Sequence, residues 1–254
     1  MQLKGFDNLS RHFPELNSAG DRFKIAAYFF GVFALVTAYF ILTDQIPTWT
    51  LDSQIVVMAL GYLILSRFFT QKKAYTERYQ ESAYRRAFSR FAIPGLAVVF
   101  ASIAHIAYMN GPKFTQPTLV ITFTWAGWVF IAIGAILWLR SVLAFGFDNI
   151  AMLYVYFPEQ SRMVSSSIYG IVRHPVYGAA LRVAVGLALL NQGIYPITFV
   201  ILLPLFVFGW LRLVEERELI ERIPDYAEYR KKVPALFPKP NRIPAFFEFL
   251  FTGG

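Results

Sequence analysis

Long stretches without charged residues are the feature that most constrains this chain. Several windows of roughly 20 residues contain almost no Asp, Glu, Lys or Arg, and this is the length an α-helix needs to cross the hydrocarbon core of a bilayer. Only 16% of the residues are charged, against about 25% in an average soluble domain. The sequence therefore predicts an all-α integral membrane protein, a polytopic bundle of transmembrane helices.

Six windows are predicted to be transmembrane spans, and the last two form a helical hairpin turned at residues 191–193. At 1.5 Å per residue the fifth span is only about 22 Å long, so it barely crosses the hydrocarbon core. The predicted spans are Phe23–Thr43, Leu51–Thr70, Phe91–Met109, Leu119–Leu139, Val176–Leu190 and Ile197–Val214.

Basic residues gather in the links on one side of this predicted bundle. Link 71–90 and the C-terminal segment are rich in Lys and Arg, whereas the opposite links 44–50 and 110–118 contain Lys113 as their one basic residue. Lys and Arg mark cytoplasmic loops, so both termini and both ends of the hairpin are predicted to be cytoplasmic. The net charge of +8 then faces the lipids of an anionic leaflet, and no nucleic-acid partner is expected.

Ionisable residues concentrate at the two cytoplasmic ends of the hairpin. Pro175 suits the first turn of the fifth span, so the N–H groups of that helix start should point to the cytoplasm beside Arg173 and His174, an arrangement suited to an anion. Glu215 and Glu216 end the sixth span. Because a hairpin brings its two ends together, we expect these carboxylates to lie near Arg173 and His174, as in a functional site.

Arg212 precedes Glu216 by four residues, which places both on one face of an α-helix. Two interpretations stay open. The pair could form a structural bridge, or Arg212 could point inward and steer an acceptor carboxylate while Glu216 holds it or contacts a cofactor. With three His and no Cys, a metal cluster is not expected, and no Walker loop, dinucleotide fingerprint or nucleophile elbow is present.

In their order and spacing these motifs resemble the isoprenylcysteine carboxyl methyltransferase family, which shares its core with membrane phospholipid methyltransferases. The family pattern is an Arg-His-Pro-x-Tyr block, a helical hairpin, a Glu-Glu-x-x-Leu block, paired tyrosines and a Val-Pro. The matching residues are Arg173–Tyr177, Glu215–Leu219, Tyr226 with Tyr229, and Val233-Pro234. The chain departs from the family pattern at Ser167, Ala179 and Ile223-Pro224.

The resemblance implies that S-adenosylmethionine binds at the cytoplasmic face, between the hairpin and the C-terminal segment. The implied cofactor-binding residues are Arg173, His174, Tyr177, Glu215, Tyr226 and Tyr229, and the implied catalytic residues are Arg212 and Glu216. The chain then divides into an N-terminal tail or interfacial helix (1–21), N-terminal spans and links (22–164), a methyltransferase core (165–240) and a C-terminal tail (241–254).

The implied reaction is methyl transfer to a lipidic or prenylated acceptor, a lipophilic molecule that enters from the bilayer. A carboxylate acceptor is favoured because it is already a nucleophile at neutral pH, whereas an amine must first lose a proton. Three alternatives remain open: a phospholipid-type amine N-methyltransferase, an NADPH-dependent membrane reductase of the sterol type, and a lipid-binding protein without catalytic activity.

Overall fold

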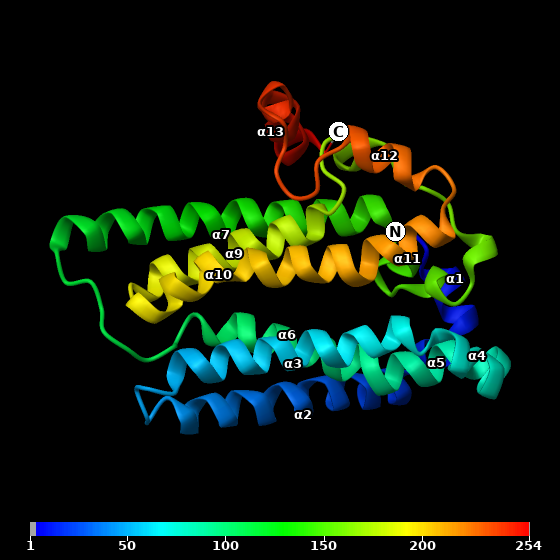
Figure 1. The fold of residues 1–254 in the computed structure, drawn as a ribbon, viewed down its shortest axis with the longest axis horizontal. Coiled ribbons are helices and arrows are strands. Elements are labelled where there is room, and N and C mark those ends of the chain that lie inside the picture. Colours follow the sequence, from blue (N-terminus) through cyan, green and yellow to red (C-terminus); the bar gives the residue numbers. More distant parts are fainter. Residues whose placement is uncertain (1–3, 254) are drawn as a thin grey trace.

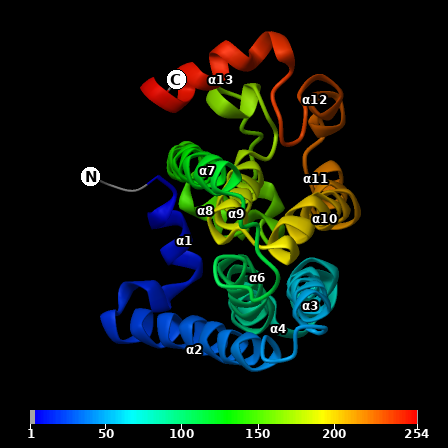
Figure 2. The same ribbon diagram turned by 90° about the vertical axis from the view of Figure 1, so that its left-hand side faces the viewer.

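The long helices of the protein lie side by side, as the computed structural model shows for residues 4–253. Figure 1 shows them running along one common direction, and Figure 2 views the same bundle from its end. Within the described residues the chain forms helices and turns, with one isolated β-bridge between Lys113 and Gly193. The long helices are α2 (Ala19–Thr43), α3 (Thr50–Thr70), α6 (Ile93–His105), α7 (Pro117–Phe145), α9 (Pro175–Asn191) and α10 (Ile194–Trp210).

Short helices gather mainly at one end of the bundle, on the right in Figure 1. We call this the motif end, and we call the opposite end, with loops 44–49, 106–116 and 192–193, the turn end. Helix α13 instead lies across the flank of α7 (Figure 1). The short helices are α1 (Phe6–His12), α4 (Lys72–Tyr79), α5 (Ala83–Ala87), α8 (Phe147–Ile150), α11 (Glu216–Arg222), α12 (Tyr226–Lys232) and α13 (Ile243–Thr252).

The predicted class, an all-α polytopic membrane bundle, is confirmed. Five helical stretches are long and apolar enough to cross a membrane, and α9, with 17 residues, is a shorter apolar helix. Its length is about 25 Å at 1.5 Å per residue, so the fifth predicted span, the first arm of the hairpin, is present as a short helix. The five longer stretches are Ala19–Thr43, Thr50–Thr70, Lys72–His105, Pro117–Phe145 and Ile194–Arg222.

Two helical stretches extend well beyond their predicted windows. Link 71–90 is helical, because α4, a 3₁₀ turn, α5 and a π-helical turn at Phe88–Ala92 lead directly into α6. Helix α7 continues to Phe145, beyond the predicted end at Leu139. Charge marks where a helix leaves the bilayer, but it does not end the helix, since Lys and Arg are good helix formers.

Glycines let α7 and α9 approach closely. A Cβ on Gly127 would lie 3.0 Å from the carbonyl oxygen of Gly186, and one on Gly134 would lie 2.9 Å from that of Ala179. Contacts this short leave no room for a side chain, so the two backbones pack directly against each other, as small residues permit between membrane helices. This packing fixes the position of α9, whose first residues belong to the block Arg173–Tyr177 described above.

Both terminal segments contain helices that pack against the bundle. Leu9 of α1 and the adjoining Phe13 are buried in the main core, where Phe13 meets the edge of Tyr84. Segment 1–21 therefore holds a helix docked on protein, and its residues 1–3 lie outside the described residues. In segment 241–254, whose last residue is also outside them, α13 buries Phe246, Phe249 and Leu250.

Candidate active site

Two segments distant in sequence are paired at the start of α9. The backbone N–H of Arg173 donates to the carbonyl of Pro234 and that of His174 donates to the carbonyl of Ala235, both at 2.9 Å. Pro175 then opens α9, where its missing N–H costs nothing. The C-terminal segment is thereby held against the first turn of the helix, which places Arg173 and His174 beside α11 and α12.

Glu216 is the centre of the polar cluster that results. Its side chain is 4% exposed. One carboxylate oxygen, Oε1, accepts from Nη2 of Arg173 at 2.7 Å and from Nε2 of His174 at 3.0 Å. The other oxygen, Oε2, lies 3.0 Å from Nε of Arg230. A buried carboxylate is stable only with such partners, so Glu216 joins three cationic groups from two different segments.

Glu215 completes the cluster on the other side of His174. Its Oε1 lies 3.4 Å from Nδ1 of His174, while its Oε2 accepts from the hydroxyl of Tyr177 and from the indole N–H of Trp210, the latter at 3.1 Å. The indole N–H is also 2.8 Å from the Tyr177 hydroxyl. His174 therefore lies between two carboxylates, one facing each ring nitrogen.

A π-helical turn at Leu211–Glu215 brings the two consecutive glutamates to one histidine. In a regular α-helix, neighbouring residues point about 100° apart and do not face a common partner. The wider π turn changes this register just before Glu216, and such turns occur often at functional sites. The sequence carries no local sign of the turn.

The two carboxylates favour the protonated form of His174. Burial alone would lower the pKa of this imidazole, but hydrogen bonds and charges from Glu215 and Glu216 outweigh burial and raise the pKa above its ordinary value. With both ring nitrogens facing carboxylates, the imidazolium can donate to each. With His174 protonated, the cluster holds two carboxylates and, with Arg173 and Arg230, three cations.

The paired tyrosines lie at the edge of this cluster. The hydroxyl of Tyr226 is 3.4 Å from Nε2 of His174, and that of Tyr229 donates to the carbonyl of Tyr169 at 2.5 Å. Their ring centroids are 5.6 Å apart. Burial raises the pKa of Tyr229 to about 12, although the charge of Arg173 opposes this, so both rings are neutral surfaces with their hydroxyls already bonded.

Most of the predicted site residues converge, and one does not. Arg173, His174, Tyr177, Glu215, Glu216 and Tyr226 form one connected cluster, with Tyr229 packed beside it. Arg212 is exposed, and the described residues give it no hydrogen bond or ion pair. The predicted pairing of Arg212 with Glu216 is absent, because Arg173, His174 and Arg230 surround that carboxylate.

Two residues of the cluster escaped the sequence-based prediction. Arg230 stood among the basic residues of the C-terminal segment, and its proximity to Tyr229 was the only signal that could have drawn attention to it. Trp210 looked like one more aromatic residue of a membrane span. Tertiary packing brings both residues to the cluster, since Arg230 lies in α12 and Trp210 directly precedes the π turn.

Arg182 is a further residue that sequence reasoning missed, although its signal was plain. It is an arginine within the apolar run of α9, and cations inside spans are costly and commonly functional. Its Nη1 donates to the carbonyl of Gly178 at 2.7 Å, and its guanidinium lies 5.4 and 5.2 Å from the ring centroids of Phe237 and Phe246. These contacts tie α9 to the C-terminal segment.

Part of the cluster is exposed. The side chain of Glu215 is 21% exposed and that of Arg230 is 38% exposed, whereas Arg173, His174 and Glu216 are covered by protein. An incoming polar molecule would therefore meet Glu215 and Arg230 first.

Residues 122–223 match the family model of the phospholipid methyltransferases. This region contains the start of α9 and both glutamates, and it ends before Tyr226 and Arg230. A curated protein of Cupriavidus metallidurans, the cobalt-zinc-cadmium resistance protein CzcN, is 28% identical over 87 residues, which cover 34% of this chain and 40% of that protein. No solved structure matches the chain. The resemblance noted in the sequence, to membrane methyltransferases related to the isoprenylcysteine carboxyl methyltransferases, is confirmed.

Proposed function

We propose that this chain, a membrane methyltransferase by its family region at residues 122–223, transfers a methyl group from S-adenosylmethionine to a carboxylate of a lipidic or prenylated acceptor. The observation that carries this proposal is the placement of His174 between Glu215 and Glu216, inside that family region and at the end of the spans. A cluster of opposite charges that is partly buried and partly exposed is typical of a ligand site.

The donor set of the cluster fits the cofactor. S-Adenosylmethionine has one carboxylate and two positive centres, its ammonium and its sulfonium, and the cluster offers groups of both signs. We assign the ammonium to the side of Glu215, which is the more exposed glutamate, and the carboxylate to the cationic side that Arg173, His174 and Arg230 form. When bound, the cofactor supplies an electrophilic methyl group for in-line transfer.

The tyrosines suit the remaining part of the cofactor. The hydroxyls of Tyr177 and Tyr229 donate to Glu215 and to the carbonyl of Tyr169, and that of Tyr226 lies beside His174. An adenine suits such side chains, since aromatic rings favour stacked or edge-on contacts with other rings. We propose that Tyr177, Tyr226 and Tyr229 fill this role.

The state of the two glutamates favours a carboxylate acceptor. Both oxygens of Glu216 are paired with cations, and Glu215 accepts from three groups, so neither is a free base that could deprotonate an amine. A carboxylate needs only orientation and loss of water, which alignment in a site can provide. We propose that Glu216 fixes the cationic groups in place and that exposed Arg212 draws the acceptor carboxylate to this end of the bundle.

A second candidate is methylation of a phospholipid-type amine. It is favoured by the description of the matched family, phospholipid methyltransferase, and it would use the same cofactor cluster. The two reactions differ in their product: a methyl ester releases methanol in mild alkali, whereas an N-methyl group is stable to it.

We further propose that the motif end faces the cytoplasm, together with both termini. The basic residues of α4, α5 and α12 lie at this end (Figure 1), and a Lys and Arg excess marks the cytoplasmic side. Cysteines introduced at Thr48 or Lys113 should react with a membrane-impermeant reagent in intact cells, and those at Tyr79 or Lys239 should not. Labelling at Tyr79 would reverse this orientation.

Calorimetric titration of the purified chain with S-adenosylhomocysteine and NADPH, in parallel, tests the cofactor assignment. We expect S-adenosylhomocysteine to bind and NADPH not to bind. His174→Ala should weaken the binding by about 1–3 kcal/mol, because a charged group loses its partner. Binding of NADPH would favour the reductase, binding of neither would favour a lipid-binding protein, and parent-like binding by His174→Ala would mean that the cofactor binds elsewhere.

A further inference from the structure

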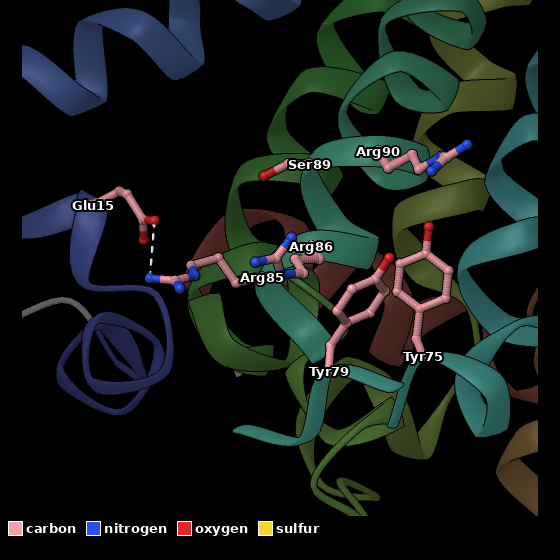
Figure 3. A pocket seen from close by; sticks show the side chains of 7 residues that line it. All are labelled: Glu15, Tyr75, Tyr79, Arg85, Arg86, Ser89 and Arg90. Carbon is pink, nitrogen blue, oxygen red and sulfur yellow. Dashed lines mark ion pairs between the residues drawn. The ribbon is translucent and has the colours of Figure 1, made fainter. Parts of the chain in front are cut away.

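A second polar site lies at the motif end, in the link between α3 and α6. It is an open cavity of about 500 Å³ between the N-terminal segment and the α4–α5 link, and Figure 3 shows its side chains. None of the residues of the His174 cluster lines it. The lining residues are Glu15, Tyr75, Tyr79, Arg85, Arg86, Ser89 and Arg90.

The packing of the link explains why its arginines share this cavity. Ala83, Tyr84 and Ala87 are buried in the main core, which turns Arg85 and Arg86 of the same helix away from it. The helix then widens into the π-helical turn Phe88–Ala92. Ser89 and Arg90, which belong to this i→i+5 turn, line the same cavity. Residues of α5 and residues of the π-helical turn therefore share one surface.

The charges of the cavity are not balanced. Arg85 is paired with Glu15 at 3.2 Å, as the dashed line in Figure 3 marks, but the described residues give Arg86 and Arg90 no carboxylate partner. Three arginines against one glutamate therefore leave two positive charges uncompensated. Arg86 is held instead by Ser82, at 3.3 Å from Nε to Oγ, and by the ring of Tyr79, whose centroid is 4.7 Å from the guanidinium.

The chemistry of these groups fits a phosphate. Guanidinium groups match the oxygens of a phosphate with two parallel hydrogen bonds, better than lysine does. Ser89, Tyr75 and Tyr79 add hydroxyl groups to the lining. A general excess of positive charge on the cytoplasmic side would be served equally well by arginines scattered over the link. It does not require that they line a cavity together with hydroxyl groups.

We propose that this cavity binds a phosphate group at the membrane surface, the headgroup of an anionic phospholipid. The position supports a lipid source, because the cavity follows the end of α3 at Thr70 and precedes the apolar residues of α6, where the bilayer core gives way to the headgroups. The site is separate from the proposed methyl transfer and holds a lipid that is not consumed.

Binding of dihexanoyl phosphatidic acid to the purified full chain in a neutral detergent tests this site, with dihexanoyl phosphatidylcholine and inorganic phosphate as comparison ligands. We expect phosphatidic acid to bind, and the double variant Arg86→Gln/Arg90→Gln to bind it at least about tenfold more weakly, a loss of about 1.4 kcal/mol. The matched control is Arg22→Gln/Arg67→Gln, which removes two exposed arginines from the motif end and should bind as the parent does. Melting temperatures verify that both variants are folded.

Each outcome of this titration decides one point. Equal losses of affinity in the two double variants would mean that net charge alone explains the binding, and would overturn the site. Parent-like binding by Arg86→Gln/Arg90→Gln would also overturn it, and so would the absence of binding by any of the anions. If inorganic phosphate binds as tightly as phosphatidic acid, and its binding is lost in Arg86→Gln/Arg90→Gln, the anion site stands with a soluble phosphate as its ligand. Because S-adenosylhomocysteine binding is measured separately, failure here leaves the proposed function untouched.

Discussion

The two ends of the bundle each contain a buried histidine with carboxylate partners, and they differ in what surrounds it. At the turn end, His105 is 0% exposed and lies between Asp44, at 3.1 Å from its Nε2, and Gln54, at 2.8 Å from its Nδ1. The same Asp44 oxygen accepts from the backbone N–H of Asn110 at 3.0 Å. One acid, one amide and one ring, stacked on Phe40 at 3.8 Å, make a closed network.

At the motif end, His174 has two carboxylates instead of one, and two arginines join them. Its partners come from segments that are far apart in sequence, and Glu215 and Arg230 are partly exposed. The turn-end network has neither the additional charged groups nor the partly exposed ones. The two clusters use similar residue types. They differ in the number of charged side chains and in the exposure of those side chains to solvent, and we take these two properties to distinguish the candidate ligand site.

The largest effect is expected at the turn end. Asp44→Ala removes the carboxylate oxygen that bonds both His105 and Asn110, and hydrogen bonds to a charged group contribute about 1.5–3 kcal/mol each. The melting temperature in detergent should fall strongly, while the folded fraction binds S-adenosylhomocysteine as the parent does. Asp52→Ala, which removes an exposed carboxylate of α3, is the control. A turn-end variant that melts like the parent would show that the closed network does not stabilise the fold.

At the motif end the expected effect is on the ligand. Glu216→Gln keeps the shape of the side chain but takes away the charge that holds Arg173, His174 and Arg230. Affinity for S-adenosylhomocysteine should fall by about 2 kcal/mol, the scale of a hydrogen bond to a charged group. Exposed Glu221→Gln is the matched control. If both variants bind equally well, the cluster is structural, like the one at the turn end.

The stability of the protein should depend on pH through His174. The pKa of His174 is raised in the folded protein by Glu215 and Glu216, so the protonated ring stabilises the fold fully below its ordinary pKa, near 6.5. This contribution is lost as the pH rises through the raised pKa. The melting temperature should therefore fall with pH above about 6.5, and fall less in His174→Gln. Parallel pH profiles for the two proteins would contradict the raised pKa.

The smallest effect on stability and affinity is expected for Arg212→Lys. Arg212 is exposed and has no partner among the described side chains, so its replacement should change stability by less than about 0.5 kcal/mol. Lysine keeps the charge but loses the planar fork that suits a carboxylate. We expect parent-like melting and cofactor binding with slower single-turnover methyl transfer. Lowered melting with parent-like turnover would instead assign Arg212 to the fold.

The main outline of the bundle could be predicted because the bilayer imposes it. Windows without charge mark the spans, and a hairpin must bring residues 173 and 174 near residues 215 and 216. Both predictions rest on chain connectivity and solvation, which are local properties of the sequence. The proximity of His174 to Glu215 and Glu216 bears out the second of them.

The finer geometry could not be predicted because packing decides it. The π turn at Leu211–Glu215 has no sequence signature, and it separates exposed Arg212 from buried Glu216, which an α-helical repeat places on one face. Arg230 reaches Glu216 because the pairing of residues 173–174 with 234–235 brings α12 alongside. The cavity of Arg86 and Arg90 likewise depends on a second π turn, in link 71–90, whose sequence indicated only an excess of basic residues.

The most direct test of the central claim is transfer of a labelled methyl group. Membranes containing the parent chain, Glu216→Gln or Glu221→Gln would be incubated with S-adenosylmethionine carrying a deuterated methyl group, and extracted lipids analysed by mass spectrometry. We predict label in the lipid fraction for the parent and Glu221→Gln, released as methanol in mild alkali, and little label for Glu216→Gln. Label in all three samples to the same extent would contradict the assignment of the methyl transfer to the cluster around His174.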